Sequence, residues 1–188
     1  MNNNTGYYIT DKGEKVIIES QRFLNLSNRN IVELILPQGI KNVYCHNNQL
    51  NTSIILPEGI KDVYCYNNQL NTSIILPEGI KYVYCHNNQL KELILPEGIK
   101  YIYCYNNQLT ELILPEGIES VYCHNNQIKE LILPEGIKYV SCENNQLNTS
   151  IILPEGIKYV CCDNVIDVNK YMGPEWNDCD IQIIITPI

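Results

Sequence analysis

A five-residue segment, Leu-Pro-Glu-Gly-Ile, recurs along most of this chain, with Gln in place of Glu in the first copy. The prolines of its seven copies are Pro37, Pro57, Pro77, Pro96, Pro115, Pro134 and Pro154. Successive copies are separated by 20, 20, 19, 19, 19 and 20 residues. A short period sustained over so many copies indicates a solenoid of stacked coils, because each coil buries its apolar side chains against its neighbours. We therefore expect function on an extended surface built from columns of equivalent residues.

Composition limits the classes of partner. The 188 residues are 45% hydrophobic, which is enough for a continuous core, and the formal net charge is −8. That charge argues against nucleic acid and against anionic membranes, since both attract clustered Lys and Arg. No apolar run approaches the roughly 18 to 20 residues of a transmembrane helix. We expect neither a nucleic-acid partner nor a membrane partner.

The repeat accounts for most of the nine cysteines. Seven occupy one repeat position: Cys45, Cys65, Cys85, Cys104, Cys123, Cys142 and Cys162. An odd total, and an N-terminus without the basic and apolar regions of a signal peptide, favour free thiols in a reducing compartment. We expect a cytoplasmic protein.

One copy shows the pattern of the whole set. Residues 99–109 read Ile-Lys-Tyr-Ile-Tyr-Cys-Tyr-Asn-Asn-Gln-Leu. This is L-x-x-L-x-L-x-x-N-x-L with Ile, Val and Cys in Leu positions, and it resembles the leucine-rich repeat family. Intact copies stand at 40–50, 60–70, 80–90, 99–109, 118–128 and 137–147. A degenerate copy precedes them at 24–31, and a broken one begins at Ile157.

The resemblance implies a mainly β solenoid of about eight coils, with a parallel concave sheet, terminal caps and little or no helix. The alternation in Ile102-Tyr103-Cys104 predicts the same short strand, with Ile102 and Cys104 facing the core. The return path is too short and too rich in proline for a helix. In this respect the repeats are similar to those of bacterial type III effectors. Their richness in Asn, Ile and Tyr is most similar to the repeat proteins of giant, mimivirus-like DNA viruses.

One asparagine follows each cysteine by three residues. These are Asn48, Asn68, Asn88, Asn107, Asn126 and Asn145. The backbone turns after the strand, and an Asn side chain offers both donors and an acceptor for its buried polar groups. The family resemblance implies an internal asparagine ladder, which is a structural role.

The ends of an open solenoid need caps, because they expose apolar surface and unpaired strand edges. Residues 7–10 and 15–19 flank Asp11-Lys-Gly13 and predict a β-hairpin. We predict an N-terminal cap over 1–20, leucine-rich repeats over 21–165 and a C-terminal cap over 166–188.

Aromatic residues fill the outward strand positions, where a partner would dock. The candidate partner-binding residues are Tyr44, His46, Tyr64, Tyr66, Tyr82, Tyr84, His86, Tyr101, Tyr103, Tyr105, Tyr122 and His124. Tyrosine suits interfaces because it gives a large contact area at low rotamer cost. The alternative is that in-register tyrosines only stabilise neighbouring strands.

Catalytic and metal chemistry are not expected. Adjacent strand residues point to opposite faces, so each cysteine of a Cys-His pair such as Cys85-His86 faces the core while the histidine faces solvent. The histidines recur on alternate coils, roughly 9 to 10 Å apart, which is too far to share a zinc ion. We predict no catalytic residues, no metal and no cofactor. Cys161 is expected to be the most exposed thiol of the repeat cysteines.

A further column consists of isoleucines in the return path. They are Ile35, Ile55, Ile75, Ile94, Ile113, Ile132 and Ile152. Strict alternation would expose them as a convex stripe, a surface for a second partner or for homo-oligomerisation. The favoured interpretation is that an irregular backbone leaves them half-buried.

Together these features favour a non-enzymatic protein–protein interaction module that binds a partner on its Tyr/His-rich concave face. The resemblance implies a viral or pathogen factor that acts on a host protein in the host cytoplasm. Two alternatives stay open. One is a glycan-binding module, since sugars stack on aromatic rings, and the other is a self-associating structural protein.

Overall fold

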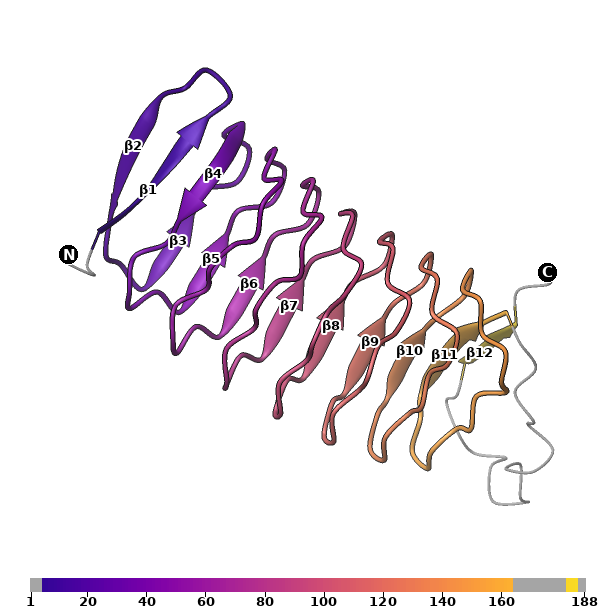
Figure 1. Ribbon diagram of the computed structural model, residues 1–188. Coiled ribbons are helices and arrows are strands. Elements are labelled where there is room, and N and C mark those ends of the chain that lie inside the picture. Colours follow the sequence, from indigo (N-terminus) through magenta and orange to yellow (C-terminus); the bar gives the residue numbers. More distant parts are fainter. Residues whose placement is uncertain (1–4, 164–181, 186–188) are drawn as a thin grey trace.

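The computed structural model describes residues 5–163 and 182–185, and it is an elongated solenoid whose coils follow one another along a single axis (Figure 1). Its strands are β1 (Thr5–Thr10), β2 (Lys15–Glu19), β3 (Phe23–Asn25), β4 (Ile31–Ile35), β5 (Asn42–Tyr44), β6 (Asp62–Tyr64), β7 (Tyr82–Tyr84), β8 (Tyr101–Tyr103), β9 (Ser120–Tyr122), β10 (Tyr139–Ser141), β11 (Tyr159–Cys162) and β12 (Gln182–Ile185). The described residues contain no helix, and so none that is long and apolar enough to cross a membrane. The prediction of a mainly β repeat solenoid is confirmed.

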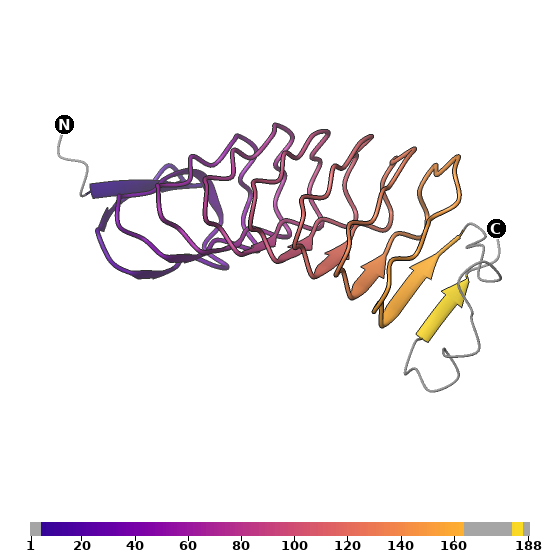
Figure 2. The ribbon, with the colours of Figure 1, turned by 90° about the horizontal axis from the view of Figure 1, so that it is seen from below.

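Nine strands form one parallel sheet along a single side of the solenoid (Figure 2). Its order is β12-β11-β10-β9-β8-β7-β6-β5-β3. Val63 pairs with Val83 across a 20-residue repeat, and Val83 pairs with Ile102 across a 19-residue repeat, in the same register. The extra residue of the longer copies is therefore accommodated outside the strands, and the outward columns stay aligned.

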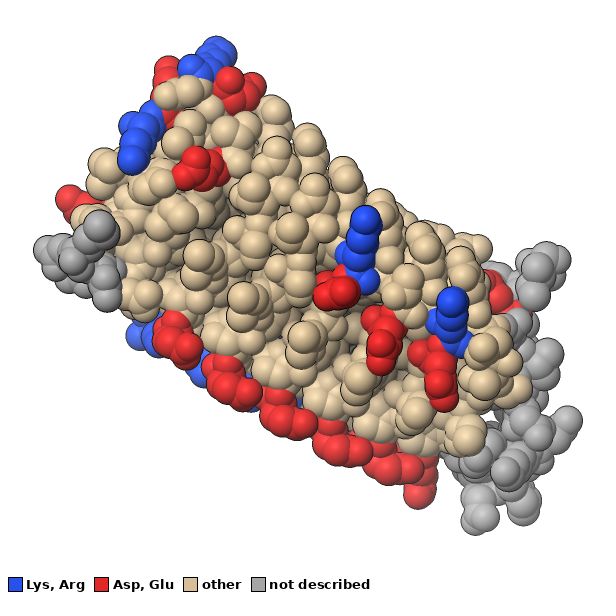
Figure 3. Space-filling view, viewed as in Figure 1, with Lys and Arg blue, Asp and Glu red and all other residues tan. Residues whose placement is uncertain are grey.

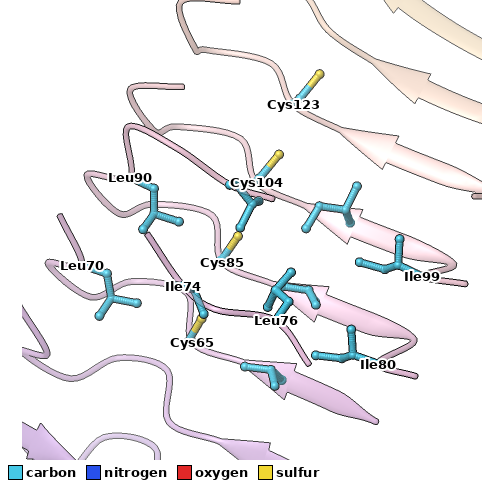
Figure 4. Packing of buried hydrophobic residues seen from close by; sticks show 14 of the residues in the cluster. Cys65, Leu70, Ile74, Leu76, Ile80, Cys85, Leu90, Ile99, Cys104 and Cys123 are labelled. Carbon is cyan, nitrogen blue, oxygen red and sulfur yellow. The ribbon is translucent and has the colours of Figure 1, made fainter. Parts of the chain in front are cut away.

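The inward residues form one continuous core. Ile102 and Cys104, predicted to face inward, are both fully buried. Figure 4 shows Cys65, Cys85 and Cys104 in one row, each from a successive coil, with apolar side chains of the return path opposite. Because each coil contributes only a few core residues, its apolar surface is buried only when the neighbouring coils are present.

The proline-containing turn requires a conformation that few residues adopt. The glycine of each Pro-Glu-Gly or Pro-Gln-Gly turn has a φ between 76° and 88°. This is the left-handed region, which glycine enters at no steric cost. The turn thus explains why every copy carries glycine after its Glu or Gln.

The N-terminal end carries a second, antiparallel sheet of order β2-β1-β4. β1 and β2 form a hairpin that turns at Asp11–Gly13, where the predicted hairpin stands. The sequence did not predict β4, which belongs to the return path of the first coil and pairs with β1. A Cβ at Gly6 would lie 2.1 Å from the Ile35 carbonyl oxygen, so this pairing requires glycine. The domain limits at residues 20 and 165 stay a prediction.

The opposite end falls mostly outside the described residues. Of the predicted C-terminal cap, 166–188, only β12 is described, and its backbone pairs in parallel with β11. The sheet therefore continues by one strand beyond the last repeat.

The favoured interpretation of the isoleucine column is wrong. Ile55 exposes 70% of its surface, whereas its neighbours Ile54 and Leu56 are buried. The physical reason is that the return segment, although it forms no regular strand from coil two onward, stays extended enough for successive side chains to alternate between core and solvent. The isoleucines therefore form an exposed stripe on the face opposite the nine-stranded sheet.

Candidate functional site

The outer side of β5–β9, with the residue two positions after each strand, brings all twelve predicted partner-binding residues together. We call this surface the tyrosine face. Along each strand these residues alternate with a fully buried Val or Ile and a fully buried Cys, so their side chains lie on the outer face of the sheet. Ten of the twelve form two parallel columns of five rings.

The first column consists only of tyrosines: Tyr44, Tyr64, Tyr84, Tyr103 and Tyr122. Neighbouring ring centroids lie 4.2 to 4.6 Å apart, and their planes differ by 5° to 12°. In-register parallel strands are spaced by about 4.8 Å, so identical side chains on them meet at stacking distance. The strand register itself produces the stack.

The second column alternates histidine and tyrosine: His46, Tyr66, His86, Tyr105 and His124. Here the centroids lie 4.3 to 4.5 Å apart, with planes 8° to 13° apart. The two remaining members, Tyr82 and Tyr101, stack at 5.0 Å beside the first column. Both columns are continuous over five coils.

Stacking decides which atoms a ligand can reach. Each inner ring, such as Tyr84, has a neighbouring ring on both of its faces, so it presents its edge and hydroxyl group outward. Most members are consequently half-buried, and Tyr82 is the most exposed at 38%. A ligand therefore meets ring edges and polar atoms, and it does not meet free ring faces.

The tyrosine face is electrically neutral near pH 7. Burial, together with the nearby His124 and His46, lowers the pKa of His86 from 6.5 to about 4. Burial also lowers the pKa of His46. The Nδ1 atoms of His46 and His86 are buried and make no hydrogen bond with the described part of the chain, so no acceptor holds a proton there. The phenols resist ionisation as well, since burial raises the pKa of Tyr84 and Tyr103.

A polar cluster ends the aromatic columns. The Oγ atom of Ser141 lies 2.9 Å from Nδ1 of His124 and donates to Oε2 of Glu143 at 2.8 Å. Oε1 of Glu143 lies 3.8 Å from the same Nδ1. A Ser-His-acid triad uses the two different imidazole nitrogens, whereas serine and carboxylate here meet one. With Ser141 only 4% exposed, the cluster is a structural boundary of the tyrosine face.

Seven of the eight described thiols occupy the inward repeat position and face away from this surface, whereas Cys161 lies in register with Ser141 on the outer side of the sheet. All eight described cysteines are buried, and burial raises the pKa of Cys65 and Cys123 to about 12. Cys161, expected to be the most exposed, is the most exposed of the eight but is itself buried at 6%. No group of three or more His, Cys, Asp or Glu residues that could hold a metal ion occurs in the described residues.

The predicted inner asparagines join successive coils. The Nδ2 atom of Asn88 donates to the carbonyl oxygens of Cys65 at 3.1 Å and Cys85 at 3.0 Å. Its Oδ1 accepts from the backbone N–H of Leu70 at 3.0 Å. Asn68 and Asn107 repeat this pattern with their own coils. Each inner asparagine therefore pairs buried backbone groups of two coils.

A second asparagine ladder, which was not predicted from the sequence, runs beside the first at the surface. Each Nδ2 donates to the Oδ1 of the preceding coil at 2.6 to 3.0 Å along Asn28, Asn47, Asn67, Asn87, Asn106 and Asn125. All but Asn28 have φ between 53° and 55°, the left-handed region that asparagine tolerates. The signal was available, because every intact repeat carries an Asn-Asn doublet and the inner ladder uses only its second member.

Solved structures share this geometry. The leucine-rich-repeat domain of a Shigella effector aligns with a TM-score of 0.69 at 22% identity, over 88% of this chain and 81% of that one. YopM of Yersinia enterocolitica aligns with a TM-score of 0.61 at 22% identity over 68% of this chain. YopM of Yersinia pestis, described as a leucine-rich effector protein, aligns at 0.56 and 26% over 70%. The chain is a leucine-rich-repeat protein.

This leucine-rich-repeat protein resembles bacterial effector repeat domains in its fold. It spans 34% and 47% of the two YopM chains, so the comparison concerns part of those proteins. No protein-family model matches, and no curated protein does. A fold of this kind suggests a protein–protein interaction module.

Proposed function

We propose that this chain is a non-enzymatic module that binds a folded protein partner on the tyrosine face. The observation that carries the proposal is the pair of five-ring stacked columns over β5–β9. They form a broad, uncharged surface of aromatic rings whose edges and hydroxyl groups point outward. Tyrosine-rich surfaces of this kind are typical of protein interfaces.

Stacking also lowers the cost of binding. An immobilised side chain normally costs about 0.5 to 1.5 kcal/mol of rotamer freedom when a complex forms. Tyr84, held between Tyr64 and Tyr103, has already lost that freedom on folding. A partner would thus meet a preorganised surface.

A glycan is supported less well. Sugars bind aromatic side chains by lying on the ring face, and the faces of the inner rings are covered by neighbours. Ring edges with hydroxyl groups suit the mixed apolar and polar surface of a protein. We therefore keep a protein as the proposed ligand class.

The proposal extends to a viral or pathogen factor that acts on a host protein in the cytoplasm. The resemblance to effector repeats supports the first part. The free thiols of Cys45, Cys65, Cys85, Cys104, Cys123, Cys142 and Cys161 support a reducing compartment. Capture from a host-cell lysate would identify the partner.

The test compares three immobilised proteins in one lysate of eukaryotic cells. They are the wild type, Tyr64→Ala/Tyr84→Ala/Tyr103→Ala and, on the opposite face, Ile75→Thr/Ile94→Thr. We expect the wild type and the isoleucine variant to capture the same protein, and the tyrosine variant to lose it. Equal capture by all three would contradict the proposal.

A fold control accompanies this test. In Tyr64→Phe/Tyr84→Phe/Tyr103→Phe the stack remains while three hydroxyl groups are removed. This variant is expected to melt close to the wild type and to retain partial capture, which separates lost contacts from lost structure.

A further inference from the structure

The isoleucine stripe is the largest regular apolar feature outside the tyrosine face. Six of its seven members, all except Ile35, expose between 63% and 76% of their surface: Ile55, Ile75, Ile94, Ile113, Ile132 and Ile152. With coils about 4.8 Å apart, the six residues extend over about 24 Å. A contiguous apolar surface of this regularity is unusual on a monomer and marks an interaction site.

Hollows separate the isoleucines. A shallow hollow lined by Ile113, Leu114, Ile132 and Leu133 lies between two adjacent coils, and another lies between Ile94 and Ile113. Ridges and hollows thus alternate at the coil period over these three coils. A second copy of this chain has the same coil period, so its coils can face these coils one for one along the stripe.

The two margins of the stripe differ in charge. Figure 3, which shows this face, has a row of acidic residues along one margin. These are the glutamates of the proline-containing turns: Glu58, Glu78, Glu97, Glu116, Glu135 and Glu155. In the described residues none of these glutamates forms an ion pair with the lysines that precede the strands, since Lys61 and Lys81 donate to glycine carbonyl oxygens of the following coil. The other margin carries Lys-Glu, Thr-Glu or Asn-Thr-Ser.

These margins select one orientation for two copies placed face to face. If the solenoids ran in opposite directions, the glutamate row of one copy would lie against the glutamate row of the other. If they run in the same direction, each glutamate row lies against the mixed margin. Glu97 then faces the Lys91-Glu92 pair of the other copy, and only Glu116 faces a net negative residue, Glu111. Like charges in contact are unfavourable, so the second arrangement is preferred.

We propose that a second copy of this chain covers the isoleucine stripe, in a two-fold dimer whose solenoids run in the same direction. In this arrangement each coil faces the equivalent coil, so the two isoleucine rows lie side by side and cover each other from solvent. The tyrosine faces of both copies point outward, away from the interface. A partner bound there would therefore meet a bivalent protein.

Sedimentation velocity of the full chain over a wide concentration range tests the association. The wild type is expected to approach twice its 21.7 kDa as the concentration rises. Ile94→Thr/Ile113→Thr/Ile132→Thr should weaken the dimer more than about tenfold, while Ile94→Val/Ile113→Val/Ile132→Val should stay close to the wild type. Thr keeps the branched shape at exposed positions, so unchanged circular dichroism is expected.

Two results would overturn the dimer. One is a wild-type protein that stays monomeric at the highest concentration measured. A monomeric wild-type protein that binds vesicles of neutral phospholipid would count in the same way, because the stripe would then contact lipid. The other is a threonine variant that dimerises as tightly as the wild type. Neither depends on whether the tyrosine face binds a partner.

Cross-linking tests the orientation, using single cysteines near the two ends of the stripe. Ile55→Cys and Ile152→Cys are each made in a Cys179→Ser background and oxidised by air with copper phenanthroline. In the proposed dimer each new cysteine faces its own counterpart, so each variant alone should form a disulfide-linked dimer. Cross-linking only when the two variants are mixed would show opposite directions and overturn the proposed arrangement. The background protein without a new cysteine is the control.

Discussion

The rings of Tyr84 and Tyr103 stack with centroids 4.6 Å apart and planes 12° apart, although the residues lie 19 positions apart in the chain. The strand register sets this distance, because both side chains leave equivalent positions of neighbouring strands. The same stack therefore contributes to the stability of the solenoid and shapes the proposed binding surface. The two contributions can be separated by experiment.

Replacing Tyr84 measures the stabilising part. Tyr84→Ala removes the ring that stacks with Tyr64 and Tyr103, so we expect the free energy of unfolding to fall by about 2 to 3 kcal/mol. Tyr84→Phe keeps both stacks and should cost less than about 1 kcal/mol. Urea unfolding followed by circular dichroism gives both values. Equal losses in the two variants would mean that the hydroxyl group, and not the stack, stabilises the fold.

The inner asparagine ladder should be sensitive to substitution as well. In Asn88→Ala the buried N–H of Leu70 loses its partner, while the carbonyl oxygens of Cys65 and Cys85 each keep one asparagine donor, from Asn68 and Asn107. One buried group left unpaired costs about 1 to 3 kcal/mol and each further lost hydrogen bond about 0.5 to 1.5 kcal/mol, so we expect a loss of at least about 2 kcal/mol in urea unfolding. Asn87→Gly, next to it in the surface ladder, keeps the left-handed backbone and should cost less than about 1 kcal/mol. A reversed order of the two losses would contradict the roles assigned to the doublet.

Acid should weaken the fold through His86. Its pKa is about 4 in the folded chain against 6.5 for the free side chain, so the unfolded chain binds more protons between these values. The free energy of unfolding is then unaffected above pH 6.5 and falls as the pH drops from 6.5 towards 4. His86→Phe keeps a ring in the stack and removes the proton site. Thermal melting at several pH values should show the wild type losing more stability than the variant over this interval, and parallel curves would contradict the pKa shift.

The thiols should be inert in the folded protein. The thiolate is the reactive form, and burial raises the pKa of Cys65 and Cys123 to about 12 and that of Cys161 to about 11. Mass spectrometry after a short treatment with iodoacetamide at neutral pH should find the eight described cysteines unmodified. The same treatment in urea should modify all of them. Rapid labelling of Cys65 in the native protein would contradict its burial.

Much of this architecture could be predicted because the same residue pattern occurs in every repeat. The periods of 19 and 20 residues, the alternation at Ile102-Tyr103-Cys104 and the Asn three positions after each cysteine lead to the solenoid and its parallel sheet. One ambiguous residue matters little when six copies agree. The outward placement of the tyrosines and histidines followed from the same alternation.

Three features depend on information that the repeat pattern does not carry. The pairing of β1 with β4 is a long-range contact made once, at the end of the solenoid. The exposure of Ile94 depends on backbone angles in a segment that forms no regular strand. The surface asparagine ladder depends on the left-handed backbone at residues such as Asn87. Each is decided by local dihedral angles or by a single contact rather than by a column of equivalent residues.

Site-specific photo-crosslinking tests the proposed partner-binding face most directly. Benzoylphenylalanine is introduced at Tyr82, the most exposed member of the tyrosine face, and in a second protein at Ile75 on the opposite side. Each protein is irradiated in a lysate of eukaryotic cells, and the cross-linked products are identified by mass spectrometry. We expect position 82 to capture one foreign protein reproducibly and position 75 to capture a second copy of this chain. A foreign protein captured only from position 75, or none captured from position 82, would contradict a protein-binding role for the stacked tyrosines and histidines.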